Sequence, residues 1–366
     1  MSVRLLVVTD EMEVGGTQTQ IFHLLNNIDQ SKFTPVLLFF RNRSHLVDLL
    51  ESNGIRAVQI QKRGSIDPVF FLKLLAFLWR EKFEVIHAFS FSAEMWTALA
   101  SLVARPKKLI TSIRGKYEWY TKTQWRIKRW VTRRSHSVVT NSRVAGEFAF
   151  KQMNLESKKL TVIRNGIDIP SLPDRQPEKN QQDGSVKPLV MTFCGRLVDH
   201  KNIPCLLKGF GRISENLGED VQLVMIGDGP EREQTEALIR SLALNNVTLV
   251  GEHDDPLSIV SQCDVAVSTS IREGLSNAIL EAMSLAIPVV ASNVGGTPEI
   301  ITHNVNGLLF SSDDEVQFAD AAITLLRSRS ERARIGAAAR NDVSARFSIP
   351  GMVDSFQGHY QSEDEA

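Results

Sequence analysis

The feature that most constrains this chain is an alternation of short apolar runs with helix-like segments, which occurs twice along the sequence. The apolar runs fit strands that are buried on both faces, and the segments between them have the periodicity of helices. Such alternation is typical of an open, doubly wound parallel sheet. A polar stretch rich in Pro, Asp, Gln and Lys, residues 170–188, separates the two series. The sequence therefore predicts an α/β protein with two Rossmann-like domains and a linker between them.

The predicted domains are residues 1–169 and residues 189–346, and residues 347–361 read as a final amphipathic helix interrupted at Gly351. Predicted strands are 4–9, 34–40, 57–60, 85–87, 109–113, 137–140 and 160–163 in the first series, and 189–194, 221–226, 247–250, 264–267, 288–291 and 307–310 in the second. Predicted helices include 18–27, 45–52, 68–81, 93–104, 203–217, 231–242 and 278–286.

Length and charge agree with two domains that face different partners. The chain has 366 residues, enough for two hydrophobic cores, and 42 Lys+Arg balance 42 Asp+Glu. Residues 1–180 hold 28 basic and 16 acidic residues, whereas residues 181–366 hold 14 and 26. A basic half joined to an acidic half indicates different electrostatic surroundings for the two domains.

The remaining compositional signals favour a cytoplasmic protein. No apolar run is long enough to span a membrane, and the N-terminus is predicted to be a strand rather than a signal peptide. Cys194, Cys205 and Cys263 have no metal-ligand spacing and are expected to be buried free thiols in a reducing compartment.

Residues 116–134 combine three tryptophans with seven Lys or Arg residues. One interpretation is a helix that lies on an anionic membrane surface, so that the protein is peripheral on the inner face of the membrane. A second is a structural helix whose aromatic side chains pack inward beneath a solvated charged face. Nucleic-acid binding is a third, but no recognised nucleic-acid motif accompanies the segment, and we expect no nucleic-acid partner.

The stretch from Ser268 to Glu281 is the strongest candidate for a functional site. It leads from a predicted buried strand into a predicted helix and contains Gly274, with Glu273 and Glu281 eight residues apart. Backbone N–H groups at such a helix start suit a phosphate group, and carboxylates beside them can accept hydrogen bonds from hydroxyls. A phosphate site beside hydroxyl acceptors is what a nucleotide sugar requires.

Two further motifs follow strand ends. Arg196 and Lys201 come after the strand 189–194, where a planar guanidinium and a compact ammonium can bind a diphosphate. Gly15 and Gly16 come after the first strand and precede a helix, which is another arrangement suited to an anion. Ligands of doubly wound sheets bind at these carboxyl ends.

These motifs resemble those of the retaining glycosyltransferases of family 4, which have the GT-B fold, in which two Rossmann-like domains face a cleft. The resemblance covers nearly the whole chain. It rests on Gly15-Gly16, Asn165-Gly166-Ile167-Asp168, Gly195-Arg196-Leu197 with Lys201, Gly227-Asp228-Gly229-Pro230, Glu273 with Glu281, and Gly295-Gly296 with Pro298-Glu299.

The resemblance implies roles for these residues. Arg196 and Lys201 look like the cations that neutralise the leaving diphosphate, Glu281 like the acceptor of ribose hydroxyls, and Glu273 like the carboxylate that contacts the donor sugar. It also implies a last helix that packs back on the first domain, and a reaction without metal or other cofactor. The remaining implied donor-binding positions are Gly15, Gly16, Gly227, Gly251, His253, Gly274, Leu275, Ser276 and Asn277.

One position departs from the family pattern. Many members have a histidine near the donor sugar in the first domain, and the matching position here carries Arg114. A cation there could bind the sugar or a phosphate, so Arg114 is added to the donor-binding set, but the role of a histidine cannot be transferred to it. His87 lies at an earlier strand end, either as part of the site or as an ordinary strand-end histidine.

The resemblance implies transfer of a sugar from a nucleoside-diphosphate sugar, by family usage a UDP-sugar, to a glycan or lipid-linked acceptor in polysaccharide or glycolipid biosynthesis. A nucleotide-sugar epimerase of GT-B-like fold is an alternative, and it would need no acceptor. A non-catalytic nucleotide-sugar-binding protein is another alternative, which the complete set of charged motifs disfavours.

Overall fold

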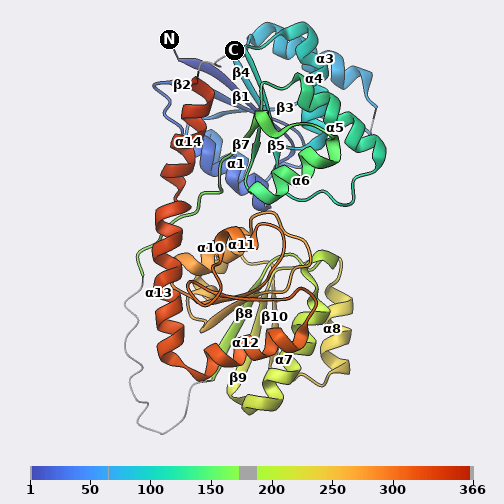
Figure 1. The fold of residues 1–366 in the computed structure, drawn as a ribbon. Helices are drawn as coiled ribbons and strands as arrows, with labels where there is room; N and C mark the ends of the chain where they lie inside the picture. Colours follow the sequence, from blue (N-terminus) through green and yellow to red (C-terminus); the bar gives the residue numbers. More distant parts are fainter. Residues whose placement is uncertain (1, 65, 173–187, 363–366) are drawn as a thin grey trace. The chain divides into compact units, whose positions relative to one another are not determined.

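The structure is a computed structural model that describes residues 2–64, 66–172 and 188–362. The chain forms two compact units, one made of Met1–Gly166 with Ile349–Ala366 and the other of Ile167–Ser348 (Figure 1). The predicted linker, residues 170–188, lies almost entirely outside the described residues.

A seven-stranded parallel sheet forms the centre of the first unit, in the order β3-β2-β1-β4-β5-β6-β7. The strands are β1 (Val3–Glu11), β2 (Phe33–Arg41), β3 (Arg56–Gln59), β4 (Val85–Ala88), β5 (Lys108–Ile113), β6 (Ser137–Thr140) and β7 (Leu160–Val162). The helices are α1 (Gly16–Asn27), α2 (His45–Ser52), α3 (Pro68–Glu81), α4 (Phe91–Ala104), α5 (Lys122–Arg134), α6 (Arg143–Met153) and α14 (Ile349–Gln361).

Alternating residues of β1 bury the two faces of this sheet against different helices. Leu5 and Val7 belong to the core that includes side chains of α1, α2 and α14, whereas Leu6 and Val8 belong to the core that includes α3, α4 and α5. Burial on both faces explains why the strand reads as a continuous apolar run. Chain order reverses between β1 and β4, the point at which doubly wound sheets bind ligands.

The second unit repeats this architecture with a six-stranded parallel sheet in the order β10-β9-β8-β11-β12-β13. Its strands are β8 (Leu189–Cys194), β9 (Val221–Ile226), β10 (Val247–Gly251), β11 (Val265–Ser268), β12 (Val289–Ser292) and β13 (Leu308–Phe310). Its helices are α7 (Ile203–Leu217), α8 (Arg232–Ser241), α9 (Pro256–Val260), α10 (Asn277–Ser284), α11 (Thr297–Ile300), α12 (Glu315–Arg327) and α13 (Arg329–Arg346). The predicted fold class, two Rossmann-like parallel-sheet domains, is confirmed.

Two predictions about helices were incomplete or wrong. Helix α14 runs without interruption through Gly351, because its buried stripe continues on both sides of that residue, with Ile349 before it and Met352 and Phe356 after it. Helix α13 was not predicted, since its buried positions are sparse and small, and its sequence is mostly charged residues and alanine. Four further helices, α6, α9, α11 and α12, were also given no bounds from the sequence.

None of the helices in the described part of the chain is long and apolar enough to cross a membrane.

Two glycines of α7 provide a test of the second core. A Cβ on Gly209 would lie 2.3 Å from the ring of Phe318 on α12, whereas a Cβ on Gly211 would meet only Leu244 at 3.8 Å. We expect Gly209→Ala to destabilise the second unit by about 1–3 kcal/mol through overpacking. Gly211→Ala, the matched control, should be neutral or stabilising by up to about 1 kcal/mol. Urea unfolding measures both, and equal effects of the two substitutions would contradict the packing described.

Candidate functional site

The second sheet reverses its chain order between β8 and β11, and the loops that follow these two strands form the candidate site. Strands β8 and β11 are paired in parallel, so their carboxyl ends, Cys194 and Ser268, lie at the same edge of the sheet. The loop after β8 carries Arg196 and Lys201, and the loop after β11 carries Glu273. The sheet topology therefore brings together motifs that are about 70 residues apart in the sequence.

The closest charged contact in this site joins Lys201 to Glu273. The Lys201 ammonium lies 2.7 Å from Oε2 of Glu273, and both side chains are largely buried. The Ser270 hydroxyl donates to the same carboxylate oxygen at 3.2 Å. Burial alone would raise the pKa of Glu273, but the charge and hydrogen bond of Lys201 outweigh it and hold the pKa below its usual value. Glu273 is therefore an ionised carboxylate beside a cation.

Hydrogen bonds hold the two loops to each other. The Thr269 hydroxyl donates to the carbonyl of Lys201 at 2.9 Å, and the Ile271 amide donates to the carbonyl of His200, also at 2.9 Å. The positions of Lys201 and Glu273 therefore depend on backbone contacts as well as on their own ion pair.

The predicted glycine motif at residues 295–296 fixes the backbone of Glu273. Gly295 has a φ of +53°, and a Cβ there would lie 1.8 Å from the Glu273 carbonyl oxygen. The Gly296 amide donates to the carbonyl of Gly274 at 2.9 Å. Only glycine allows the backbones to approach this closely, so Gly295 sets where Glu273 lies.

A second pair of glycines packs against the loop that carries Arg196. A Cβ on Gly227 would lie 2.2 Å from the carbonyl oxygen of Gly195, and one on Gly229 would lie 2.3 Å from that of Leu197. The Leu197 amide also donates to the carbonyl of Asp228 at 2.9 Å. Gly227, predicted from the resemblance to bind the donor, is seen here to support the loop that carries Arg196.

Glu281 lies on α10, where its backbone carbonyl accepts a hydrogen bond from the Ser284 hydroxyl at 2.7 Å. Its side-chain carboxylate forms no hydrogen bond or ion pair with another described residue. Burial raises the pKa of Glu281 to about 7. The charge of Glu281 also contributes, after burial, to the raised pKa of the Cys194 thiol at the end of β8. An acceptor that is desolvated and has no protein donor is suited to hydroxyls of a ligand.

A pocket opens between the ends of β8 and β11 and the start of α10. Thr192, Lys201, Ser268 and Ser276 contribute its polar side chains. Ser276 is the N-cap residue of α10, with no side-chain hydrogen bond to the helix. The full lining is Thr192, Phe193, Cys194, Lys201, Val260, Ala266, Val267, Ser268, Ser276, Ala278, Ile279, Ala282 and Val289. Of the predicted site residues, Lys201 and Ser276 line this small pocket, whereas Arg196, Glu273 and Glu281 do not.

The other predicted residues of the second unit lie around these loops. Arg196 is exposed and forms no hydrogen bond or ion pair with any described residue. Gly251 ends β10 with a φ of +82° and accepts a hydrogen bond from the Gly227 amide at 2.7 Å. His253 is exposed and accepts from the Asp255 amide. Gly274, Leu275, Ser276 and Asn277 form the turn into α10.

In the first unit, Gly15 and Gly16 lie between the end of β1 and α1. Gly15 is the N-cap residue in extended conformation, and Gly16 is the first residue of the helix. The predicted strand–glycine–helix arrangement is therefore present, with α1 beginning two residues earlier than predicted. It lies beside the reversal point of the first sheet.

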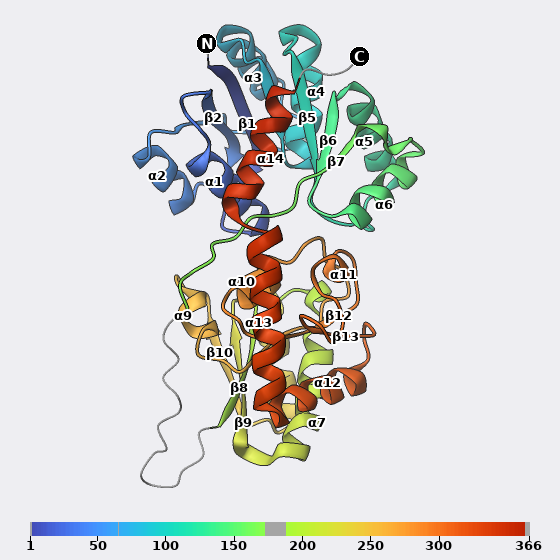
Figure 2. The same ribbon diagram turned by 60° about the vertical axis from the view of Figure 1, so that its left-hand side comes forward.

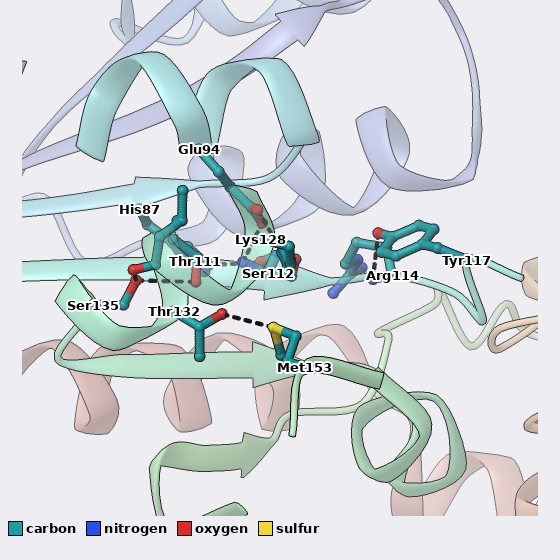
Figure 3. Close-up of polar contacts among 11 residues, drawn as sticks. His87, Glu94, Thr111, Ser112, Arg114, Tyr117, Lys128, Thr132, Ser135 and Met153 are labelled. Carbon is teal, nitrogen blue, oxygen red and sulfur yellow. Dashed lines mark hydrogen bonds and ion pairs between the residues drawn. The ribbon is translucent and has the colours of Figure 1, made fainter. Parts of the chain in front are cut away.

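Arg114 follows β5 and is a half-buried cation without a carboxylate partner among the described residues. Its Nη2 donates to Oδ1 of Asn165 at 2.8 Å, and its guanidinium carbon lies 5.7 Å from the centre of the Phe89 ring. Burial lowers the pKa of Arg114 to about 10. The backbone amide of Arg114 donates to the hydroxyl of Tyr117 at 2.9 Å (Figure 3).

A buried polar network at the end of β5 was not predicted from the sequence (Figure 3). Lys128 of α5 forms a buried ion pair with Glu94 of α4 and donates to the carbonyl of Ser112 at 3.0 Å. Glu94 also accepts from the Ser112 amide at 3.0 Å. The Ser112 hydroxyl contacts Nε2 of His87 at 2.8 Å, and the other ring nitrogen contacts the Tyr360 hydroxyl at 2.8 Å.

This network decides between the two interpretations of His87. Its side chain is fully buried with both nitrogens bonded, and burial lowers its pKa well below the usual value. His87 is therefore a neutral core histidine that links β4, β5 and α14. The buried side of α5 consists of Lys128, Val131 and Thr132, so only the helical spacing of Lys128 and Val131 could have suggested a buried lysine.

The described residues contain no group of three or more His, Cys, Asp or Glu side chains placed to hold a metal ion.

Gly295→Ala tests the support of Glu273. We expect a loss of at least about 2 kcal/mol of stability, because the substitution combines an unfavourable φ with a backbone clash. Gly218→Ala is the matched control, since Gly218 also has a positive φ, +71°, but nothing lies within 4 Å of its Cβ position. Thermal unfolding measures both, and a loss at Gly295 no larger than at Gly218 would contradict this role.

Glu281→Gln tests the desolvated carboxyl group. Its folded-state pKa of about 7 lies above the usual 4.5, so the folded protein holds this proton more tightly than the unfolded chain does. Wild-type stability therefore falls as pH rises from about 4.5 to about 7. We expect Glu281→Gln to raise the melting temperature by at least about 2 °C at pH above 7, with little change near pH 4.5. Glu233→Gln, at an exposed position, is the control. If Glu281→Gln left the pH dependence of the melting temperature unchanged, the raised pKa of Glu281 would be refuted.

Comparisons with known proteins agree with this geometry. The sequence profile "Glycosyltransferase Family 4" matches residues 14–170, and "Glycosyl transferases group 1" matches residues 174–342. EpsF of Bacillus subtilis, which carries the name of a glycosyltransferase, is 27% identical over 304 residues, 79% of each chain. The UDP-Gal:α-D-GlcNAc-diphosphoundecaprenol α-1,3-galactosyltransferase of Escherichia coli is 25% identical over 310 residues, 79% of this chain and 78% of its own.

Among solved structures, Anabaena HepE in complex with UDP-glucose superposes with a TM-score of 0.85 at 24% identity, covering 98% of this chain and 100% of HepE. The lipopolysaccharide outer core galactosyltransferase WaaB superposes with a TM-score of 0.75 at 18% identity, covering 97% and 98%. These likenesses show the fold. Together with the two consecutive profiles, they establish that this chain belongs to the group 1, family 4 glycosyltransferases and has the GT-B fold.

Proposed function

We propose that this glycosyltransferase moves a sugar, with retention of configuration, from a UDP-sugar to a glycan or lipid-linked acceptor in polysaccharide or glycolipid biosynthesis. The observation that carries the proposal is the Lys201–Glu273 pair at the reversal point of the second sheet. The name of the Escherichia coli galactosyltransferase, with its UDP-sugar donor and lipid-diphosphate acceptor, supports the substrate classes, as do the UDP complexes of HepE.

The proposed donor position follows from the charges of the second unit. The diphosphate lies against Lys201, Arg196 and the amides at the start of α10, where cations and the helix N-terminus favour negative charge. Glu273, held by Lys201 and Ser270, accepts hydrogen bonds from hydroxyls of the donor sugar. Glu281 accepts from the ribose hydroxyls, which supply the donors that the protein does not.

In the proposed reaction, the bond between the anomeric carbon and the diphosphate oxygen breaks while a new bond forms to the acceptor oxygen on the same face. The acceptor proton passes to the leaving phosphate oxygen, so no protein base is needed. Charge accumulates on the diphosphate in the transition state, and Lys201 and Arg196 stabilise it there more strongly than in the ground state. We propose that these two cations do this without a metal ion.

Lys201→Ala and Glu273→Gln test the assignment. We expect each to lower kcat/KM at least about 100-fold, because each removes a charge beside the reacting groups. Acceptor-dependent release of UDP measures activity, with UDP-, GDP- and ADP-sugars compared and with EDTA present in parallel. Lys208→Ala, on the exposed side of α7, is the matched control and should keep full activity.

The same assay distinguishes the alternatives. Full turnover in both site variants would remove the site assignment, and loss of activity in EDTA that added metal restores would overturn the metal-free mechanism. Interconversion of the donor sugar without acceptor would indicate an epimerase. Donor binding without turnover would indicate a non-catalytic protein. An inverted anomeric configuration of the product, read by NMR, would reject retention.

A further inference from the structure

Three neighbouring helices of the first unit, α3, α4 and α5, expose an unusual amount of apolar surface. They cover the same face of the sheet and pack against one another in order (Figure 1, Figure 2). Leu72 is 63% exposed, Trp79 is 68% exposed and Val103 is 58% exposed. The exposed large apolar side chains of these helices are Val69, Leu72 and Trp79 on α3 and Leu99, Leu102 and Val103 on α4. We call this surface, with the outer side of α5, the α3–α5 face.

The exposed apolar residues have helical spacing, so they form stripes rather than isolated positions. On α3, exposed Leu72 and Trp79 are two turns apart, opposite a buried stripe that includes Leu74 and Phe77. On α4, Leu102 and Val103 follow Leu99 by three and four residues, so all three lie on one side of the helix. A helix that is apolar on both sides is expected where both sides are covered.

A groove between α4 and α5 extends the apolar surface. It is almost entirely apolar, and its walls come from the outer side of both helices. The lining residues are Met95, Leu99, Thr123, Arg126, Ile127 and Trp130. The groove places the basic residue Arg126 directly beside apolar side chains, which is the arrangement of an interface between lipid tails and headgroups.

The charges of this face are nearly all positive. The three helices carry two carboxylates, and neither is available: Glu94 is buried against Lys128, and Glu81 is bonded to Arg4, Arg56 and Arg80. By contrast, α2 and α6 each expose carboxylates in the same unit. The exposed cations of the face are Lys73 and Arg80 on α3 and Lys122, Arg126, Arg133 and Arg134 on α5.

From these observations we propose that the α3–α5 face docks on a lipid bilayer that contains anionic headgroups. Apolar stripes would enter the interfacial region, and the cations of α5 would contact the headgroups. A second copy of this chain is disfavoured as the occupant, because two such faces would bring like charges together. The proposal does not depend on the reaction assigned above. It also differs from a membrane contact through residues 116–134 alone, because α3 and α4 supply most of the apolar surface.

Vesicle co-sedimentation of the full chain tests the proposal, with phosphatidylcholine vesicles alone and with added phosphatidylglycerol. We expect binding to the anionic vesicles that weakens as salt is raised. The apolar variant Leu72→Gln/Val103→Gln and the charge variant Arg126→Gln/Arg133→Gln should each lower vesicle affinity at least about tenfold. The control variant Leu49→Gln/Lys151→Gln changes exposed residues of α2 and α6 and should bind like wild type.

A second measurement reports the position of one side chain. Lipids brominated on the acyl chain should quench the fluorescence of wild type more than that of Trp79→Phe, because exposed Trp79 would lie in the bilayer interface. Absence of binding, equal binding to both vesicle types, or an equal loss in the control variant would overturn the proposal. So would a dimer, detected by light scattering, that only the apolar variant abolishes. Melting temperatures of all variants within a degree or so of wild type would exclude misfolding as the cause.

Discussion

The constraint on which the rest of this structure depends is that a parallel strand buried on both faces can present polar groups only near its ends. Residues of β1 and β8 are almost wholly covered by helices on either side. Charged and polar side chains therefore collect in the loops after the strands. Where chain order reverses, neighbouring loops leave in different directions and a pocket opens between them. Both sheets have this reversal of chain order, which lies between β1 and β4 in the first sheet and between β8 and β11 in the second.

In the second unit, backbone packing fixes the charged groups before any ligand is present. Gly295 lets one loop contact the backbone of Glu273, and Gly227 lets another contact Gly195. Lys201 and Glu273 neutralise each other at 2.7 Å, so neither charge is buried alone. In the proposed function, a diphosphate that approaches Lys201 would meet a cation that is already oriented. This preorganisation is what electrostatic catalysis by a glycosyltransferase requires.

The first unit uses buried charge for a different purpose. The ion pair of Glu94 and Lys128 joins α4 to α5 and bonds both backbone groups of Ser112. It thereby fixes the end of β5, directly before Arg114. The lysine that does this comes from the most basic helix of the unit, which also exposes the cations Lys122, Arg126, Arg133 and Arg134. One helix therefore both fixes the end of β5 and supplies charge to the α3–α5 face.

The sequence alone determined the fold class, most strand positions and the charged motifs, because apolar periodicity and glycine turns are local properties of a chain. It also indicated that Arg196, Lys201, Glu273 and Glu281 act together, through resemblance to a known family. It did not reveal that Lys201 pairs with Glu273, that His87 is a core residue, or that Lys128 is buried. Those facts depend on which side chains from distant segments meet. Only the tertiary structure decides this, because strand order and helix packing set the distances between residues far apart in sequence.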